Sequence, residues 1–520
     1  MLKKIGVVLV LALGAVGCSS LNTSNVCCFS GSCAGSVGVG SYEGPTFEVA
    51  SWKGELSYQT VEEKFAGDLA LCIGDEGCEK SGVRVELLKV TPVEYRTSPG
   101  SHLVGKRYDL VTPGISREHP SVICKISVSK DAKPGNVSFG PMSVRVVDRV
   151  LPPPTEWKYF LDLWQHPWAV SRFHGVKPFS DEHYAKMEPI YKTLVECGVK
   201  ALTVTLLDYP WNHQCYDAYE SMIGRVKNDD GSWSFDYTVF DKYVEFGRKC
   251  GIGPDIACYT MCPWGNMVRW KNSKGEVVSV KALPGSDEFK DYWGDFLVDF
   301  AKHLKEKGWF EDAYIAMDER SPEEVSAIAK FIREKVPGMK IAMAGNRKPS
   351  EFKDMVIDNY CQYLDHLTPD FLAECVARRR SGLKTTFYVC CGPDRPNTFM
   401  SSGDAEGFWL GVYPALGGMD GFLRWAANSW PHNPYVDAAF GTWKAGDTFF
   451  VYPNGEYSVR LISLRAGVVA AEKLRILNEA GLCEKERASF AEKYDFSKAL
   501  NGKIRFLECR KDLEALVNRQ

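Results

Sequence analysis

The sequence predicts a mixed α/β protein in which a (β/α)8 TIM-like barrel is preceded by an all-β sandwich. After residue 155, short apolar segments alternate with amphipathic segments of helix length, and eight such units are typical of a closed barrel. Before residue 151, short alternating runs are separated by turn residues and show no helical periodicity. A stiff Leu151-Pro-Pro-Pro154 segment lies between the two patterns and marks a boundary.

The first residues form a segment typical of a lipoprotein signal peptide. A basic start is followed by an apolar stretch from Val7 to Leu13 that is too short to cross a bilayer, and then by small residues that lead to Cys18. We therefore expect residues 1–18 to be a signal peptide that ends at a lipidated Cys18. Ala15 replaces the usual leucine, which keeps ordinary secretion open. The expected location is the bacterial cell envelope, at the outer membrane or in the periplasm, with a lipid anchor.

After Cys18 the chain is expected to continue as a flexible tether over residues 19–45, which are rich in Ser, Gly and Asn. Residues 46–150 follow as an antiparallel β-sandwich, with alternating runs such as Val83–Val90. Residues 151–155 are the proline-rich linker, and residues 156–480 form the catalytic barrel. Residues 481–520 are charged and helical in character, and we expect them to pack on the outside of the barrel as a C-terminal helical extension.

The barrel prediction rests on named segments, and a doubly wound open sheet is its competitor. No GxGxxG motif opens the first unit, and eight units suit closure. The expected strands are Tyr159–Trp164, Ala201–Leu207, Pro254–Tyr259, Ala313–Met317, Lys340–Ala344, Met355–Tyr363, Lys384–Cys390 and Gly421–Ala427. The expected helices include His183–Glu196, Phe289–Lys307, Pro322–Lys335, Asp370–Arg380, Asp404–Leu416 and Ser458–Glu479.

Composition and charge bear on which partners and cofactors the chain can be expected to bind. The chain has 63 basic and 66 acidic residues, so its net charge of −3 gives no reason to expect nucleic acid. Its 14 Trp and 23 Tyr suit a protein that stacks on sugar rings, although a large core explains them equally well. The 18 Cys contain no CxxC pair and the 9 His no HxxxH spacing, so we expect neither a metal site nor an organic cofactor. Two adjacent cysteine pairs, Cys27-Cys28 and Cys390-Cys391, are not expected to bridge within themselves.

The most informative residues are Asp318 and Glu319, which follow the apolar run Ala313–Met317. Two adjacent carboxylates at the end of a buried strand are costly to desolvate and repel each other, so such a strand end indicates chemistry. Side chains alternate along a strand, so both can face a cleft only if the chain turns at the strand end. The alternative is that the pair caps the helix that begins near Ser321, where early acidic residues favour the helix dipole.

Polar and aromatic side chains also follow most of the other expected strands. The carboxyl ends of parallel barrel strands meet at one rim, so these side chains are expected to converge there. Any one of them could equally be structural, but convergence over most strand ends indicates a ligand. The candidates are Trp164, Asp208, Trp264, Asn346, Tyr388, Asn397 and Trp425.

The spacing of the two carboxylates bears on mechanism. A carboxyl separation of about 5 Å suits a nucleophile with an acid, and about 6.5–9.5 Å suits inversion. Adjacent residues suit neither arrangement, but they do suit hydrolysis in which the 2-acetamido oxygen of a sugar is the nucleophile. Asp318 would then orient the acetamido group, and Glu319, with a raised pKa, would act as the acid and base.

Several longer segments are unusual enough to carry a family resemblance: Leu161–Pro167, Met317–Glu319, Cys391–Phe399, Gly421–Pro431 and Gly446–Pro453. On these segments, the stretch from about Trp157 to Leu477 resembles glycoside hydrolase family 123, the β-N-acetylgalactosaminidases. The resemblance implies exo-removal of terminal β-linked N-acetylgalactosamine by a retaining, substrate-assisted mechanism, and an N-terminal β-sandwich. The family's adjacent Asp-Glu pair falls on Asp318 and Glu319.

The implied partner is a glycan with a terminal β-linked N-acetylgalactosamine, on a glycolipid or an oligosaccharide, and the membrane is contacted through the N-terminal lipid. Position assigns Trp264 and Trp425 to a stacking floor, and Tyr388 to the acetamido oxygen. Asp208, Asn346 and Asn397 are assigned to sugar hydroxyls. A non-catalytic surface glycan-binding lipoprotein and a β-N-acetylhexosaminidase of other sugar specificity remain alternatives, because N-acetylgalactosamine and N-acetylglucosamine differ only at O4.

Overall fold

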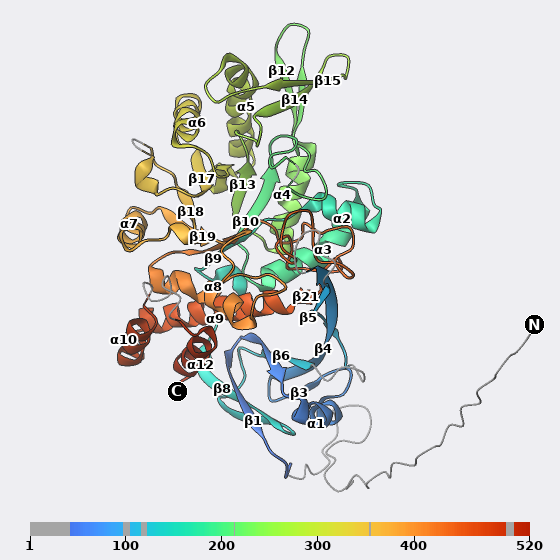
Figure 1. The fold of residues 1–520 in the computed structure, drawn as a ribbon, viewed down its shortest axis with the longest axis vertical. Helices are drawn as coiled ribbons and strands as arrows, with labels where there is room; N and C mark the ends of the chain where they lie inside the picture. Colours follow the sequence, from blue (N-terminus) through green and yellow to red (C-terminus); the bar gives the residue numbers. More distant parts are fainter. Residues whose placement is uncertain are drawn as a thin grey trace, which may run out of the picture.

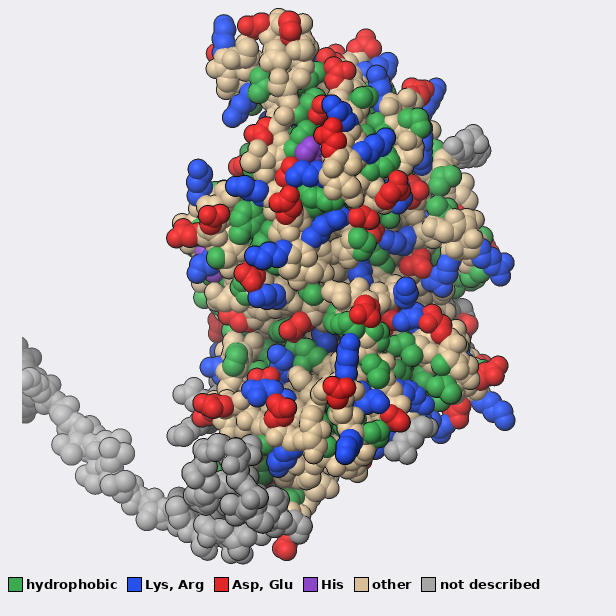
Figure 2. Space-filling model, turned by 180° about the vertical axis from the view of Figure 1, so that it is seen from behind, with side chains coloured by type: hydrophobic (Ala, Val, Ile, Leu, Met, Phe, Trp, Pro, Cys, Tyr) green, Lys and Arg blue, Asp and Glu red, His purple; other side chains and the backbone are tan. Residues whose placement is uncertain are grey.

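The computed structural model describes residues 42–96, 104–115, 122–212, 214–352, 355–495 and 504–519 of the 520-residue chain. The predicted signal peptide, Cys18 and nearly all of the predicted tether lie outside the described residues. Among the described helices, none is long and apolar enough to cross a membrane. On the face shown in Figure 2, basic and acidic side chains are interspersed, as expected from the small net charge.

Eight parallel strands form the centre of the molecule and confirm the predicted fold class (Figure 1). In their order around the sheet they are β10 (Ala201–Thr205), β13 (Asp255–Tyr259), β16 (Ala313–Met317), β17 (Lys340–Gly345), β18 (Asn359–Tyr363), β19 (Lys384–Tyr388), β20 (Gly421–Arg424) and β9 (Phe160–Leu163). Every expected strand is present. The largest difference in bounds is at β18, which begins at Asn359 rather than at Met355.

The sheet is nearly closed between β9 and β10. One parallel bridge joins Leu161 to Val199, and the side chain of Gln165 continues the pairing. Its Oε1 accepts the backbone N–H of Thr203 at 2.9 Å, and the Thr203 hydroxyl lies 3.3 Å from the Gln165 backbone nitrogen. A side chain therefore satisfies backbone groups at the one seam where regular strand pairing stops.

Helices surround the barrel on its outside (Figure 1). Several begin at a Ser or Thr whose hydroxyl accepts a backbone N–H of the first turn, such as Ser286 before α5 and Ser321 before α6. The predicted helices are all present. The helices that follow the barrel strands are α2 (Pro167–His174), α3 (Asp181–Glu196), α4 (Thr238–Cys250), α5 (Asp287–Glu306), α6 (Pro322–Lys335), α7 (Pro369–Arg380), α8 (Asp404–Gly417) and α9 (Val459–Glu479).

The N-terminal region packs two sheets around a second core. One sheet has the order β1 (Phe47–Lys53), β8 (Met142–Val150) and β7 (Gly135–Phe139). The other has the order β2 (Leu56–Val61), β6 (Val122–Val128), β4 (Val83–Arg96), β5 (Val104–Pro113) and β21 (Tyr457–Ser458), with β3 (Cys78–Lys80) paired to β4.

Two details of the N-terminal region correct the sequence analysis. A helix, α1 (Glu63–Ile73), lies where no helical periodicity was expected, and it buries Phe65, Leu69 and Ile73 against the sheets. These residues are spaced four apart and so form one apolar face. In addition, β1 and β8 pair in parallel, so the sandwich is not purely antiparallel.

A four-stranded sheet that the sequence analysis did not predict rises from the loops after β10 and β13. Its order is β12 (Trp233–Asp236), β11 (Gly224–Lys227), β14 (Met267–Asn272) and β15 (Val277–Lys281). It packs beside α5 through Arg225, whose buried guanidinium lies 3.7 Å from the ring centroid of Phe296. Figure 1 shows this sheet at the far end of the molecule from the N-terminal region.

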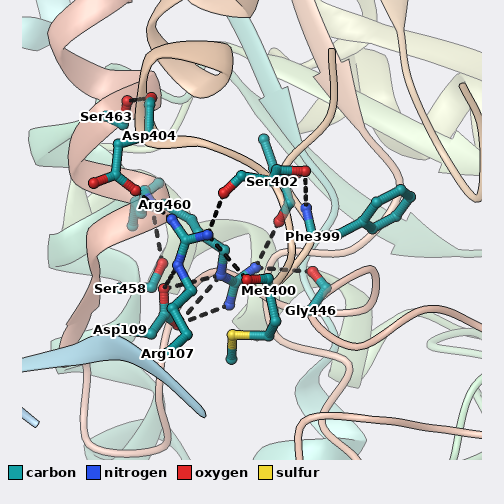
Figure 3. A network of polar contacts seen from close by, with 12 residues as sticks. Arg107, Asp109, Phe399, Met400, Ser402, Asp404, Gly446, Ser458, Arg460 and Ser463 are labelled. Carbon is teal, nitrogen blue, oxygen red and sulfur yellow. Dashed lines mark hydrogen bonds and ion pairs between the residues drawn. The ribbon is translucent and has the colours of Figure 1, made fainter. Parts of the chain in front are cut away.

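The N-terminal region is tied to the barrel by backbone pairing and by buried charge. The short strand β21, which immediately precedes α9, adds to the edge of β5. Beside it, Asp109 of β5 is fully buried against Arg460 of α9 (Figure 3). The C-terminal helix α12 (Phe506–Val517) joins this junction, where the Trp52 indole N–H donates to the Val517 carbonyl at 3.0 Å. Helix α10 (Glu484–Lys493) packs on α12.

Candidate active site

Asp318 lies one residue beyond the end of β16 and faces the barrel axis. Tyr314, four residues earlier on the same strand, lines the interior of the barrel, so Asp318 has the inward parity. Its Oδ2 accepts the indole N–H of Trp264 at 2.9 Å, and its Oδ1 accepts the backbone N–H of Glu319 at 2.8 Å. The carboxylate is half-buried and fixed from two directions.

Glu319 has the opposite parity but reaches the same cleft because regular strand pairing ends at Met317. Its Oε1 accepts the hydroxyl of Tyr388 from β19, and its Oε2 accepts the side-chain amide of Asn346, after β17, at 3.2 Å. The turn at the strand end that the sequence analysis required is therefore present. Asp318 and Glu319 are held from opposite sides by different neighbours.

The helix that follows does not use Asp318 or Glu319 as its cap. Ser321 caps α6 through its hydroxyl, and Glu324 completes a capping box with the Ser321 backbone. Because the cap is already satisfied, the capping alternative for the two carboxylates is wrong.

Arg320 organises the wall beside Asp318, and its positive charge lowers the pKa of both Asp318 and Glu319 although it forms an ion pair with neither. Its guanidinium donates to the Cys262 carbonyl at 2.8 and 3.0 Å and to the Glu319 carbonyl at 3.0 Å. It also lies 4.2 Å from the ring centroid of Trp264. Among the ion pairs of the described residues, none involves Asp318 or Glu319. Arg320 therefore fixes the tryptophan that holds Asp318.

Both carboxyl groups have raised pKa values. Burial raises the pKa of Asp318, and the Trp264 and Glu319 N–H groups oppose that effect. Burial also raises the pKa of Glu319, with a contribution from the negative charge of Asp318, whereas the Tyr388 hydroxyl lowers it. The Tyr388 pKa is itself raised far above its usual range by burial and by Glu319. Both carboxyl groups therefore hold a proton more tightly than they would in water, and a raised pKa suits a carboxyl group to act as a general acid.

The predicted tryptophans occupy different depths. Trp264 is 37% exposed and presents its ring at the mouth of the barrel. Trp425, after β20, is half-buried and donates its indole N–H to Asp447 at 3.0 Å. Trp164 is only 2% exposed, and its ring centroid lies 4.4 Å from that of Tyr259. It therefore packs inside the barrel, beneath the site, rather than at its surface.

Two predicted contacts have side chains engaged elsewhere. Asn397 is fully buried, and its amide donates to the carbonyls of Cys390 at 3.2 Å and Pro393 at 2.6 Å. It therefore shapes the loop after β19 rather than facing the cleft. Asp208, after β10, accepts the backbone N–H of Ser221 at 2.8 Å. The structure brings together Asp318, Glu319, Trp264, Asn346 and Tyr388, and it does not bond Asp208 or Asn397 to them.

Several residues of the site are not among those predicted from the sequence. The Tyr363 ring, at the end of β18, lies 5.4 Å from that of Tyr388, and its inward parity is the signal that could have identified it. The exposed His366 contacts the Asn346 carbonyl, and its charge lowers the pKa of Glu319. Asp447 follows no strand, so periodicity gives no signal for it. Among the described residues, no group of three His, Cys, Asp or Glu side chains is arranged to hold a metal ion.

The chain resembles known proteins both in sequence and in fold. The model of the glycoside hydrolase 123 catalytic domain matches residues 164–477. Among curated proteins, no match was found. A solved family 123 glycoside hydrolase from Clostridium perfringens, described in terms of glycolipid glycan hydrolysis, superposes with a TM-score of 0.77 at 24% identity, over 91% of this chain and 93% of that one. That likeness shows that the two proteins share a fold.

More distant structures share less of the geometry. A family 10 xylanase with a bacterial Ig-like domain, from termite gut, covers 84% of this chain and all of its own at 12% identity and a TM-score of 0.35. A β-galactosidase from Bacillus circulans sp. alkalophilus covers 62% of this chain and 56% of its own, also at 12% identity and a TM-score of 0.35.

Proposed function

Because the chain belongs to glycoside hydrolase family 123, we propose that it is an exo-acting β-N-acetylgalactosaminidase that works by a retaining, substrate-assisted mechanism. The observation that carries the proposal is the adjacent pair Asp318 and Glu319, held from opposite sides of one cleft and without an ion-pair partner among the described residues. Adjacent carboxyl groups do not provide a separate nucleophile and acid flanking the glycosidic bond, whereas they can serve a sugar that supplies its own nucleophile.

In the first step, the acetamido oxygen attacks C1 of the sugar while the bond from C1 to the leaving oxygen breaks. Glu319 gives its proton to that oxygen, and the Asp318 carboxylate accepts the acetamido N–H and stabilises the positive charge of the oxazoline-type intermediate. In the second step, Glu319 removes a proton from water, which attacks C1 and reopens the ring. Two displacements at one carbon retain the β configuration.

The neighbours suit these roles. Tyr388 and Asn346 orient the carboxyl group of Glu319, and Trp264 orients that of Asp318. The exposed ring of Trp264 and the half-buried ring of Trp425 offer apolar surface for the sugar face. Because the Tyr388 hydroxyl already donates to Glu319, donation to the acetamido oxygen would require substrate to displace that bond.

The substrate class we propose is a glycan with a terminal β-linked N-acetylgalactosamine, on a glycolipid or an oligosaccharide. The Clostridium perfringens protein is described as acting on glycolipid glycans, which supports the glycolipid option. A lipid anchor at Cys18 in the cell envelope would place the enzyme at a membrane surface. Mass spectrometry of the N-terminal peptide tests the anchor, because an unmodified Cys18 in the mature chain contradicts it.

The deciding experiment compares three aryl glycosides: β-N-acetylgalactosaminide, β-N-acetylglucosaminide and β-galactoside. We expect cleavage of the first alone, with the β anomer of the free sugar appearing first by proton NMR. Cleavage of the plain galactoside would exclude acetamido participation, because that sugar lacks the nucleophile. First appearance of the α anomer would exclude retention. Equal cleavage of both N-acetyl sugars would leave the mechanism standing and correct the sugar specificity.

A further inference from the structure

The loop after β19 places two adjacent cysteines beside the site. Cys390 and Cys391 follow Tyr388, whose hydroxyl donates to Glu319. Their Sγ atoms lie 3.8 Å apart, with Cys391 exposed and Cys390 half-buried. A disulfide needs an S–S distance of about 2.05 Å, so the two sulfurs are not bonded but lie close enough for one atom to bridge them. The proposed hydrolysis uses neither thiol.

The backbone that carries these thiols is fixed. Arg424 donates to the carbonyls of Val389 at 2.6 Å and Cys390 at 3.0 Å, and Asn397 donates to the Cys390 carbonyl at 3.2 Å. The Cys390 N–H donates to the Gly392 carbonyl at 3.0 Å. The sulfurs are therefore presented with a preset separation, which reduces the entropy lost when both bind one atom.

One of the two thiols is activated. The hydrogen bond from the Cys390 thiol lowers the pKa of Cys391 to about 7, so a thiolate is available near neutral pH. A thiolate is both a nucleophile and a soft ligand, and soft ligands select soft, thiophilic atoms.

We propose that Cys390 and Cys391 form a dithiol site for a single soft thiophilic atom, of the class of trivalent organoarsenicals, and that occupation of this site blocks the neighbouring glycosidase site. With an arsenic(III) oxide that carries one organic group, two As–S bonds form. The oxide oxygen leaves as water with the two thiol protons, and no electrons are transferred.

The position of the loop explains the block. The Tyr363 hydroxyl lies so close to Gly392 that a Cβ there would approach it to 2.6 Å, and the Tyr363 ring lies 5.4 Å from that of Tyr388. A group bound at Cys390 and Cys391 shares this crowded wall with the tyrosine that holds Glu319. The binding stands independently of the proposed function, and the inhibition rests on it.

The test uses phenylarsine oxide on the full chain. We expect peptide mass spectrometry to find one adduct that joins Cys390 and Cys391, and hydrolysis of aryl β-N-acetylgalactosaminide to fall in step with adduct formation. A dithiol such as 2,3-dimercaptopropanol restores the rate, and a monothiol in similar excess does not. Losing one of two linked contacts weakens binding by roughly 10²-fold or more, so Cys391→Ser should need correspondingly more reagent.

The matched control is the double variant Cys27→Ser/Cys28→Ser, which removes the other adjacent pair in the sequence and should respond like the unaltered chain. An adduct absent from Cys390 and Cys391, or equal sensitivity in Cys391→Ser, overturns the site. An adduct that leaves hydrolysis unchanged overturns the inhibition. If the untreated chain cleaves no N-acetylgalactosaminide, the proposed function fails, and mass spectrometry still decides the dithiol site.

Discussion

Two groups of buried or half-buried carboxylates in this molecule have opposite surroundings. At the junction of the N-terminal region and the barrel, Asp109 is fully buried and receives three guanidinium contacts from Arg460 at 3.0–3.2 Å (Figure 3). The Tyr452 hydroxyl also donates to Asp109, at 2.9 Å. The Arg107 Nε atom lies 3.6 Å from Oδ1 of Asp109. Arg460 also donates to three backbone carbonyls. At the barrel mouth, Asp318 and Glu319 receive neutral donors instead.

This difference distinguishes a carboxylate that stabilises the fold, Asp109, from carboxyl groups that are available for chemistry, Asp318 and Glu319. A carboxylate matched by arginine is stabilised in its ionised form, and removing one partner leaves the other charge unpaired. A carboxyl held by indole, hydroxyl and amide donors is oriented but not neutralised, so burial raises its pKa. A raised folded-state pKa means tighter proton binding in the folded chain, so ionising Asp318 and Glu319 as the pH rises lowers the free energy of unfolding. Ionised carboxyl groups at the barrel mouth therefore lower the stability of the fold, and their raised pKa values suit them to proton transfer.

The largest expected effect is on catalysis. Glu319→Gln keeps the shape of the side chain but removes its proton chemistry, so kcat/KM for a substrate with a poor leaving group should fall by roughly 10²–10⁴-fold. A dinitrophenyl glycoside, whose leaving group needs no proton, should lose much less in its first step. Equal losses on both substrates would show that Glu319 is not the acid.

At the junction the expected loss is one of stability. Asp109→Asn leaves the Arg460 guanidinium without its buried counter-charge, so the free energy of unfolding should fall by about 3–5 kcal/mol in urea denaturation. Activity per folded molecule should be unchanged at low temperature. Glu319→Gln is the contrasting control, since it removes an ionisable group whose raised pKa costs stability once the group is ionised. If Glu319→Gln destabilised the chain as much as Asp109→Asn, the two groups would not differ as described.

Tyr388→Phe tests the donor to Glu319. The hydroxyl lowers the pKa of Glu319, so its removal should raise that pKa further. Glu319 must be protonated to act first, so the alkaline limb of the kcat/KM profile should move to higher pH by about one unit, the equivalent of about 1.4 kcal/mol. A limb that moved to lower pH would contradict the assignment of Glu319 as the acid.

Trp264→Phe tests the donor to Asp318 and should have the smallest effect. The indole N–H lowers the pKa of Asp318, and Asp318 must be ionised to support the acetamido group. Its loss should therefore move the acidic limb to higher pH, by about half a unit, because a hydrogen bond at a partly exposed position is worth about 1 kcal/mol or less. The alkaline limb should stay in place, and a shift of both limbs would mean that the two carboxyl groups do not have separate roles.

Much of the barrel could be predicted because its signals are local. Strand β16 and helix α6 have the predicted bounds, since apolar runs and capping residues mark them in the sequence. The strand period predicts that Asp318 and Glu319 face opposite sides while the strand stays regular. Which of them faces inward, and how Glu319 reaches the cleft, depend on the neighbouring strands and on where regular pairing stops.

Other features depend on long-range contacts that a single sequence does not show. The sheet β12-β11-β14-β15 joins two separate loops, and its short strands are only partly buried. Asn397 was expected at the rim because of its place after β19. Its amide turns inward because buried carbonyls of that loop need donors, and loop side chains have no fixed period.

The two-residue strand β21 limits how the two halves of this chain can be recombined with other domains. It comes from the barrel half of the chain yet completes the sheet of the N-terminal half, next to the Asp109–Arg460 pair. Cutting at the Pro-rich segment would expose an unpaired sheet edge on one piece and an unmatched buried arginine on the other. Evolution and protein engineering can therefore exchange these halves only as a matched set, and a relative that carries the barrel with a foreign partner must have rebuilt this seam.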